Sequence, residues 1–255
     1  KNKKNMTIKI PEKFMGKPIK GSMEIVLAQA PQVSAPAPVQ AQAVNLGVAN
    51  INPREYIQVG IDGLNGKPVA ISTYELSGSN NKNYEDAHRF LLKQGLYMPT
   101  PKIFMEHFKN VIDAEKGKRT LNYADGSQVS NAEVEEMYKH LTTNHRDVFA
   151  VGNPGAWTWL NARFYNGNIE TIIGIDSNRN LTKTSSILES YLKEDTYIHF
   201  DFNSQGLAGV NAQSADQTYI QGENIRFWYP RDGCVAGFYA DSGRAYLGCN
   251  GNPTG

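Results

Sequence analysis

The fold prediction for this chain depends on one stretch, IRFWYPRDGCVAGFYADSGRAYLGCNGNPTG, residues 225–255. Six aromatic residues stand there among Gly, Ser, Asn, Asp and Arg. Tyr and Trp offer large contact areas at a low entropy cost, and Gly, Ser and Asn offer adaptable polar contacts. From Arg231 onward the stretch has no Lys, Glu, Gln, Met or Trp, although a segment of average composition contains several of these. The composition indicates a contact surface, and the alternative is a Gly-rich loop region.

Strands dominate the second half of the chain. Three are predicted near Ile225–Tyr229, Val235–Tyr239 and Ala245–Cys249, and Asn166-Gly167 predicts a hairpin within residues 155–176. Residues 196–207 contain a further strand, with Tyr197, His199 and Asp201 on one face and Ile198, Phe200 and Phe202 on the other. The segment SSILESYLKED, residues 185–195, is predicted to form a short helix.

Helices dominate the first half, after a hairpin predicted over residues 56–76. Asn83 is the expected N-cap of the first helix, and Thr100 caps the second, with Pro101 at its first position. Ser130 and Glu133 have capping-box spacing for a third. Because helices come first and strands cluster late, the predicted fold class is α+β with antiparallel strands late, not a βαβ arrangement.

Length, composition and charge limit the partners and the domain organisation that the chain can have. The chain has 255 residues, 40% of them hydrophobic, and a net charge of +1, which gives no electrostatic reason to expect nucleic acid or an anionic membrane as partner. No run is long enough to span a bilayer, and no signal peptide is visible. Residues 1–27 read as an N-terminal arm, residues 28–50 as an Ala/Pro/Gln-rich linker, and residues 51–255 as the main domain. The sequence starts on Lys1 and stops on GNPTG, so we expect a fragment.

Metal and catalytic motifs are weak. His140 and His145 lack a third zinc ligand nearby, and His199 beside Asp201 has no identifiable nucleophile, so a structural hydrogen bond is expected there. The loop Asp176–Asn180 begins like a calcium loop, but Leu181 and Ile187 stand where an EF-hand needs Gly and Glu. A weaker calcium site or an Asx turn remains, and the turn is favoured.

Cys234 and Cys249 are the only cysteines. They can form a disulfide if two strands bring them together, and two free thiols are the favoured alternative. A catalytic thiol would need a lowered pKa, which Arg231 or Arg244 could supply.

Three segments in a defined order carry a family resemblance: GAWTWLNARF (155–164), YIHFDFNSQGL (197–207) and QGENIRFWYPRDGCVAGFYADSGRAYLGCNGNP (221–253). With the helices after Asn83 and Thr100, they resemble the variable proteins of diversity-generating retroelements, particularly those of archaea, their viruses and related small-genome lineages. The resemblance covers roughly residues 55–255. It implies a C-type lectin fold of the formylglycine-generating-enzyme subtype, used for binding and not for catalysis, without metal or cofactor.

The resemblance also implies a mechanism for the missing residue types. In that family an error-prone reverse transcriptase copies a template RNA, mutates adenines, and the copy replaces the 3′ end of the gene. Template codons of the AAC type yield Asn, Asp, Ser, Gly, Arg, Tyr, Cys, Thr and some small or apolar residues. They cannot yield Lys, Glu, Gln, Met or Trp, which are the types absent after Arg231.

Carried onto this chain, the resemblance divides the proposed variable region, residues 225–255, into a frame and a ligand surface. The frame residues are Val235, Ala236, Phe238, Ala240, Ala245, Leu247 and Pro253. The candidate ligand contacts are Asp232, Gly233, Tyr239, Asp241, Gly243, Arg244, Tyr246, Gly248, Asn250, Gly251 and Asn252. Tyr239, Arg244 and Tyr246 are expected at the surface.

The expected partner is a protein or another cell-surface ligand, and the linker indicates tethering to a virion, an envelope or a partner complex. Family members usually continue with a final apolar strand, so the stop at Gly255 indicates truncation or an exposed sheet edge. The EPN, QPD and WND signatures of calcium-dependent sugar binding are absent. Two alternatives are an enzyme related to formylglycine-generating or sulfoxide-synthase proteins, using Cys234 or Cys249, and an adhesion protein with an unvaried tip.

Overall fold

A computed structural model describes residues 25–27, 51–63, 66–73, 76, 78, 82–143, 156–241 and 243–250, with no side-chain description for 25–27, 241 and 250. Most of the predicted arm and linker, His145 and Pro253 lie outside the described residues. Within them, no helix is long and apolar enough to cross a membrane.

The chain forms an α+β fold in which the α-helices precede most of the strands, as the sequence predicts. Its elements in chain order are β1 (Ile25–Leu27), η2 (Pro53–Glu55), β2 (Tyr56–Asp62), β3 (Pro68–Ser72), α1 (Tyr84–Leu92), α2 (Pro101–Glu115), α3 (Asn131–Thr142), β4 (Trp157–Tyr165), β5 (Asn168–Ile175), β6 (Leu181–Ile187), β7 (Thr196–Ile198), β8 (Ile225–Phe227), β9 (Val235–Asp241) and β10 (Arg244–Asn250).

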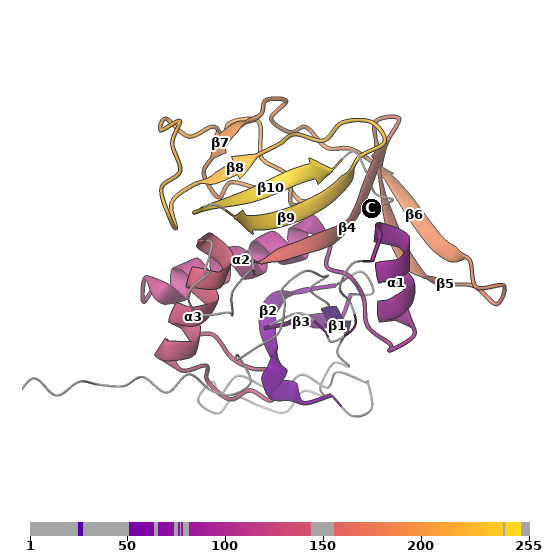
Figure 1. Ribbon diagram of the computed structural model, residues 1–255, viewed down its shortest axis with the longest axis horizontal. Coiled ribbons are helices and arrows are strands. Elements are labelled where there is room, and N and C mark those ends of the chain that lie inside the picture. The colour runs from indigo at the N-terminus through magenta and orange to yellow at the C-terminus, as the bar shows by residue number, and fades with distance from the viewer. Residues whose placement is uncertain are drawn as a thin grey trace, which may run out of the picture.

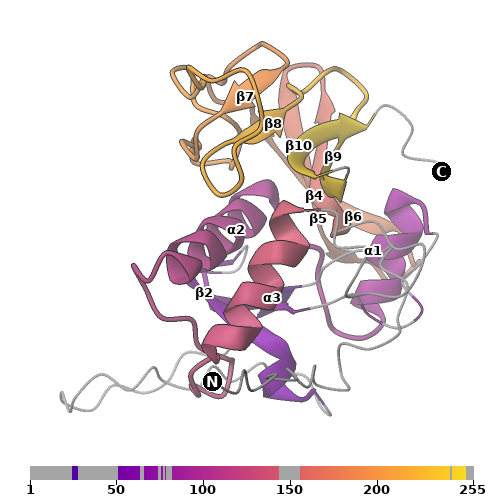
Figure 2. The ribbon, with the colours of Figure 1, turned by 60° about the vertical axis from the view of Figure 1, so that its left-hand side comes forward.

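The strands form two sheets with helices between them. The larger sheet has the order β6-β5-β4-β9-β10-β8-β7, and the smaller one has the order β1-β3-β2. Helix α2 contacts both β2 and β4, and α3 packs beside α2 and against β9 and β10. Figures 1 and 2 show α2 between the small sheet and the strands β9 and β10.

Aromatic packing joins α2 to the centre of the large sheet. Phe238 of β9 is fully buried, and its ring centroid lies 4.6 Å from that of Phe104 and 5.4 Å from that of Phe108. Side chains alternate along a strand, so Ala236, Phe238 and Ala240 share this helix-facing side. The strand register places Leu247 opposite Phe238 and Ala245 opposite Ala240, so β10 adds its apolar residues to the same core.

Helix α1 covers part of the opposite face of the sheet. Tyr84 of α1 packs edge-on against Trp159 of β4, with ring centroids 6.2 Å apart. Tyr84 and Trp159 belong to a cluster of buried hydrophobic residues on this face. Val235 belongs to the same cluster and is fully buried. The large sheet is therefore covered by α2 and α3 on one face and by α1 on a portion of the other.

The predicted helix starts and the second hairpin are confirmed. Asn83, Thr100 and Ser130 each accept a hydrogen bond from a backbone amide in the first turn of α1, α2 and α3, and the capping box with Glu133 is complete. Asn166 and Gly167 both have positive φ, 48° and 73°, which a tight β4–β5 turn requires. These features depend on neighbours in sequence, so sequence reasoning finds them.

The predicted helix over residues 185–195 is wrong. Ser185 and Ser186 instead extend β6, where they stand opposite Glu170 and Ile169 of β5. After β6 ends at Ile187, the Leu188 amide donates to Gly167 and the Leu192 amide to Ala208. Because these long-range hydrogen bonds take the backbone donors that a helix would use, the helical pattern of apolar residues does not decide the conformation.

The predicted antiparallel arrangement of the late strands is wrong at one pair, because β10 pairs with β8 in parallel and with β9 antiparallel. Strand β10, the last described strand, lies between β9 and β8. Within the described part of the chain, the edges of the large sheet are therefore β6 and β7. Strand β6 and its partner β5 form a hairpin that lies beside α1, and its far end projects beyond the helix (Figure 1).

Two buried histidines make stability depend on pH. Burial lowers the pKa of His88 and of His107 from 6.5 to about 3. Each is neutral in the folded protein but gains a proton in the unfolded chain below about pH 6.5. We therefore expect the free energy of unfolding to fall on acidification from pH 6.5, by up to about 1.4 kcal/mol per pH unit for each histidine.

Urea unfolding between pH 7 and pH 4.5 measures this slope. His107→Gln should reduce the slope by about 1.4 kcal/mol per pH unit, and His199→Gln, at an exposed site, serves as the control. A stability that rises on acidification over this range would contradict the expectation.

Candidate binding surface

A row of aromatic and arginine residues crosses the face of the large sheet opposite α2. In the strand register, Trp157 of β4 stands opposite Tyr239 of β9, and Tyr239 stands opposite Tyr246 of β10. Tyr246 is the partner of Arg226 in β8, which is the partner of Tyr197 in β7. We call these five residues the aromatic–arginine row. They come from segments far apart in sequence and meet only because β10 lies between β9 and β8.

Side-chain contacts join the two residues at each end of the row. The rings of Trp157 and Tyr239 have centroids 5.8 Å apart. The Arg226 guanidinium lies 5.2 Å from the centre of the Tyr197 ring. Arg244 lies at one end of β10, where its guanidinium is 6.0 Å from the Tyr246 ring and donates to the Tyr197 hydroxyl at 3.3 Å.

Four residues of the row are half-buried and Tyr197 is buried, whereas the neighbouring Arg244 and Trp228 are exposed. Arg244 is exposed, and Tyr239 and Tyr246 are half-buried, so none of the three side chains expected at the surface is enclosed in the core. Trp228 is 47% exposed and packs edge-on against Tyr246, with centroids 6.4 Å apart. Since these rings rest against neighbours on one side, they lose little further conformational freedom when a partner binds.

The described frame residues occupy buried positions, as expected. Ala236, Phe238, Ala240, Ala245 and Leu247 are at most 2% exposed on the helix-facing side. Tyr239 and Tyr246 alternate with them and lie on the opposite side. The two-residue period thus separates these residues from Tyr239 and Tyr246. Val235 is the exception, because it lies on the same face as Tyr239 and is fully buried in the cluster that contains Tyr84 and Trp159.

Two glycines make room for Tyr239. A Cβ atom built on Gly237 would lie 3.0 Å from the Tyr239 hydroxyl, and one built on Gly248 would lie 3.0 Å from Cε2 of the same ring. The Tyr239 ring therefore lies over the backbone of both glycines. Gly248 is itself buried, so its part in the surface is to admit this ring and not to contact a ligand.

We expect positions 239 and 248 to be energetically coupled. Gly248→Ala should lower the free energy of unfolding by about 1 kcal/mol, because the new methyl group crowds the Tyr239 ring. In a Tyr239→Ala background the same change should be neutral or stabilising, since alanine suits a strand better than glycine does. Chemical unfolding of the four variants gives a coupling of about 1 kcal/mol; strictly additive effects would contradict the packing described.

The other predicted contacts lie apart from the row. Asp232 accepts a hydrogen bond from the Asn166 amide at 2.6 Å, and the Gly233 amide donates to Phe164, so both tie β9 to the β4–β5 turn. Gly243 is exposed in the β9–β10 turn with φ of 76°. Asp241 lies in β9 and Asn250 lies in β10, and the structure does not describe their side chains. Gly251 and Asn252 lie outside the described residues.

Sequence reasoning missed the part of the surface that comes before Asp232. Trp157, Tyr197, Arg226 and Trp228 are not among the candidate contacts, although all four stand in segments that carry the family resemblance. The period of two in these segments showed that they alternate between faces. It could not show that the faces join, because strand order depends on contacts distant in sequence.

Both cysteines are free and buried beside each other. Burial, together with a hydrogen bond to the Cys234 thiol, raises the pKa of Cys249 far above its usual value. The Arg231 guanidinium forms an ion pair with Asp195, and the lowering effect of Arg231 on the pKa of Cys249 is smaller than the raising effect of burial. A neutral Cys249 thiol is a weaker nucleophile than a thiolate.

The predicted metal and catalytic candidates show local structural roles. The Asp176 carboxylate accepts hydrogen bonds from the amides of Asn178 and Asn180, at 2.9 and 2.8 Å, which is an Asx turn. Nδ1 of His199 lies 3.5 Å from the Glu223 carbonyl oxygen, and no hydrogen bond joins its ring to the Asp201 side chain in the part that the structure describes. Among those residues no cluster of three or more metal-ligating side chains occurs.

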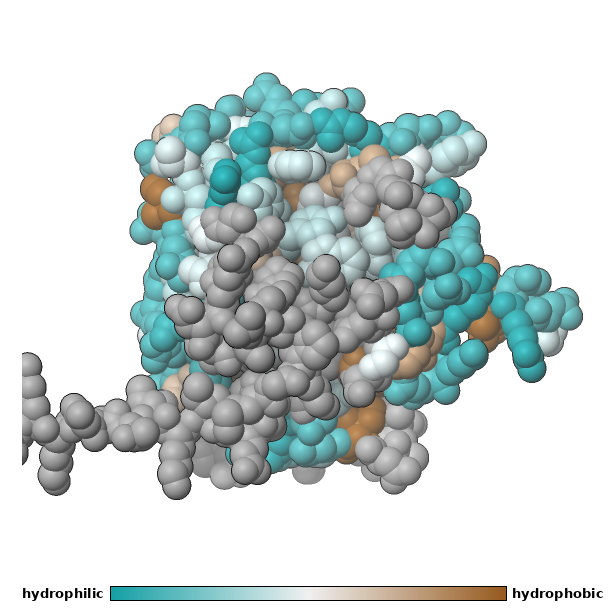
Figure 3. Space-filling view, in the orientation of Figure 1, coloured by the Kyte–Doolittle hydropathy of each residue, from teal (hydrophilic) through white to brown (hydrophobic). Residues whose placement is uncertain are grey.

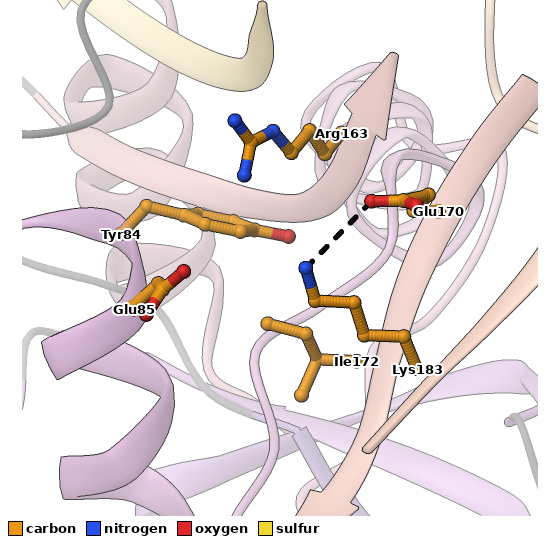
Figure 4. A pocket seen from close by; sticks show the side chains of 6 residues that line it. All are labelled: Tyr84, Glu85, Arg163, Glu170, Ile172 and Lys183. Carbon is orange, nitrogen blue, oxygen red and sulfur yellow. Dashed lines mark ion pairs between the residues drawn. The ribbon is translucent and has the colours of Figure 1, made fainter. Parts of the chain in front are cut away.

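A small polar hollow lies between α1 and strands β4–β6 (Figure 4). It is lined by Tyr84, Glu85, Arg163, Glu170, Ile172 and Lys183. Its volume is about 220 Å³ including the open space at its mouth. Lys183 and Glu170 form an ion pair of 3.8 Å across it, so the hollow's charges are partly satisfied within the protein.

The surface seen in Figure 3 is mainly hydrophilic where it is not grey, and its hydrophobic residues form small separate groups. No protein-family model, no curated protein and no solved structure matches the chain. The function proposed below therefore rests on residue composition, on the family resemblance and on the geometry of the aromatic–arginine row.

Proposed function

We propose that this chain is a non-catalytic binding protein with a C-type lectin fold of the formylglycine-generating-enzyme subtype, whose C-terminal surface is diversified by a retroelement. The observation that carries the proposal is the separation of roles along β9 and β10. Apolar residues of the proposed variable region face the helices, while Tyr239, Arg244 and Tyr246 face away from them. Side chains on that face can change without opening the core.

The exposed residue types suit recognition of a protein. Tyrosine, tryptophan and arginine supply most of the residues that dominate the energy of protein interfaces. A standard interface buries about 800 Å² on each partner, an area that spans several strands. The aromatic–arginine row extends over five strands, so it spans the width of sheet that an interface of this size covers.

The genome next to the gene provides the test. We expect a near-copy of the codons for residues 225–255 that differs mainly at adenines, close to a reverse-transcriptase gene. Codons that differ from the copy should fall at positions such as 239, 244 and 246, and not at 236, 238 or 247. The absence of such a copy, or changes concentrated at buried positions, would contradict diversification.

A further inference from the structure

Two arginines of the binding surface share one tyrosine. Arg226 stacks on the Tyr197 ring, and Arg244 donates to the hydroxyl of the same residue. Tyr197 is itself only 6% exposed, so it forms a fixed support between the two guanidinium groups. Two positive charges are thereby held close together on one face of the sheet.

Neither guanidinium is neutralised within the part of the chain whose side chains are described. No ion pair joins Arg226 or Arg244 to a carboxylate there. The neighbouring Asp195 is already bound by Arg231 and accepts a hydrogen bond from the Tyr229 amide at 3.1 Å. Since like charges repel, an anion that contacts both arginines would stabilise the arrangement.

We propose that this pair of arginines binds a carboxylate of an acidic peptide segment in a partner protein, and that the tyrosines and tryptophans of the surface contact its apolar side chains. The inference rests on the proposed function, because it assigns a partner chemistry to the same face of the sheet. Guanidinium groups match the planar geometry of a carboxylate and form charge-assisted hydrogen bonds with it. Tyr246 and exposed Trp228 flank the arginines and suit the apolar part of a peptide.

Selection from random twelve-residue peptides displayed on phage tests the inference with the full chain as bait. We expect the selected peptides to be enriched in Asp and Glu relative to the starting library. Synthetic versions should bind on the order of tenfold more weakly to Arg226→Gln and to Arg244→Gln, as for loss of a hydrogen bond to a charged group. Binding should also weaken as salt is raised, because exposed charges are screened.

Matched variants separate charge from general damage. Arg54→Gln is the control, since Arg54 also stacks on a tyrosine, 5.3 Å from the Tyr123 ring, but lies outside the row. It should leave peptide affinity unchanged.

Three outcomes would overturn the inference. The first is selection of neutral peptides whose binding ignores both arginines. The second is no selection above the level seen with Arg226→Gln/Arg244→Gln. The third is arginine-dependent binding of heparin oligosaccharides or sialyllactose without any acidic peptide, which would make the partner a glycan. Neutral peptides that depend on Tyr239 and Tyr246 would leave the proposed binding function standing, whereas absence of a template copy would contradict diversification alone.

Discussion

Phe238→Ala is expected to lower the free energy of unfolding by about 3–5 kcal/mol, as for other buried phenylalanines. Phe238 is fully buried at the centre of β9 and packs on Phe104 and Phe108 of α2. Removing the ring leaves a cavity between the sheet and the helix that supports it. Since whole domains are stable by only about 5–15 kcal/mol, this loss is a large share of the total.

Urea unfolding followed by circular dichroism measures the effect, and two further variants sharpen it. Phe238→Leu keeps most of the volume and should lose about 1–1.5 kcal/mol, which remains measurable if the alanine variant does not fold. Arg244→Ser changes an exposed residue of the neighbouring strand and should stay within about 0.5 kcal/mol of the parent. Equal losses for Phe238→Ala and Arg244→Ser would contradict the division of this hairpin into core and contact surface.

Gly206→Ala is expected to destabilise the protein by about 3 kcal/mol, because it combines a steric collision with an unfavourable backbone conformation. A Cβ atom at Gly206 would lie 2.1 Å from the amide nitrogen and 2.4 Å from the Cα atom of Lys102, in the first turn of α2. These are backbone atoms, so no side-chain rotation relieves the collision. Either the loop or the start of α2 must move, and α2 carries the rings that pack on Phe238.

Gly66→Ala is the matched control for the cost of placing alanine at a positive φ. Gly66 has φ of 68°, close to the 81° of Gly206, but nothing lies within 4 Å of a Cβ atom built there. We expect a loss of about 1 kcal/mol from conformation alone. The thermal midpoints of the two variants give the comparison, and similar decreases would show that the approach of residue 206 to α2 is not limiting.

Local signals in the sequence account for much of the fold. Asn83, Thr100 and Ser130 each mark a helix start, and Asn166-Gly167 marks the β4–β5 turn, because capping and tight turns involve residues a few positions apart. The alternation in residues 235–247 separates the buried side chains from the outward ones by the same kind of short-range rule. Fold class and the inward or outward direction of Phe238, Tyr239, Tyr246 and Leu247 therefore follow from the sequence.

Local signals fail where distant partners compete for the same residues. The apolar spacing in residues 185–195 is helical, yet Ser185 and Ser186 pair with β5, because a β-ladder satisfies their backbone groups and fills the edge of the sheet. No rule of short range could show that outcome.

The binding surface shows both kinds of information at once. Residue composition marked the segment after Arg231, and strand periodicity pointed Tyr239, Arg244 and Tyr246 outward. The contributions of Trp157, Arg226 and Tyr197 became visible only with the strand order β4-β9-β10-β8-β7, which sets them in one row. Neighbours along the chain dictate which way a side chain points, whereas packing between distant segments dictates what stands beside it.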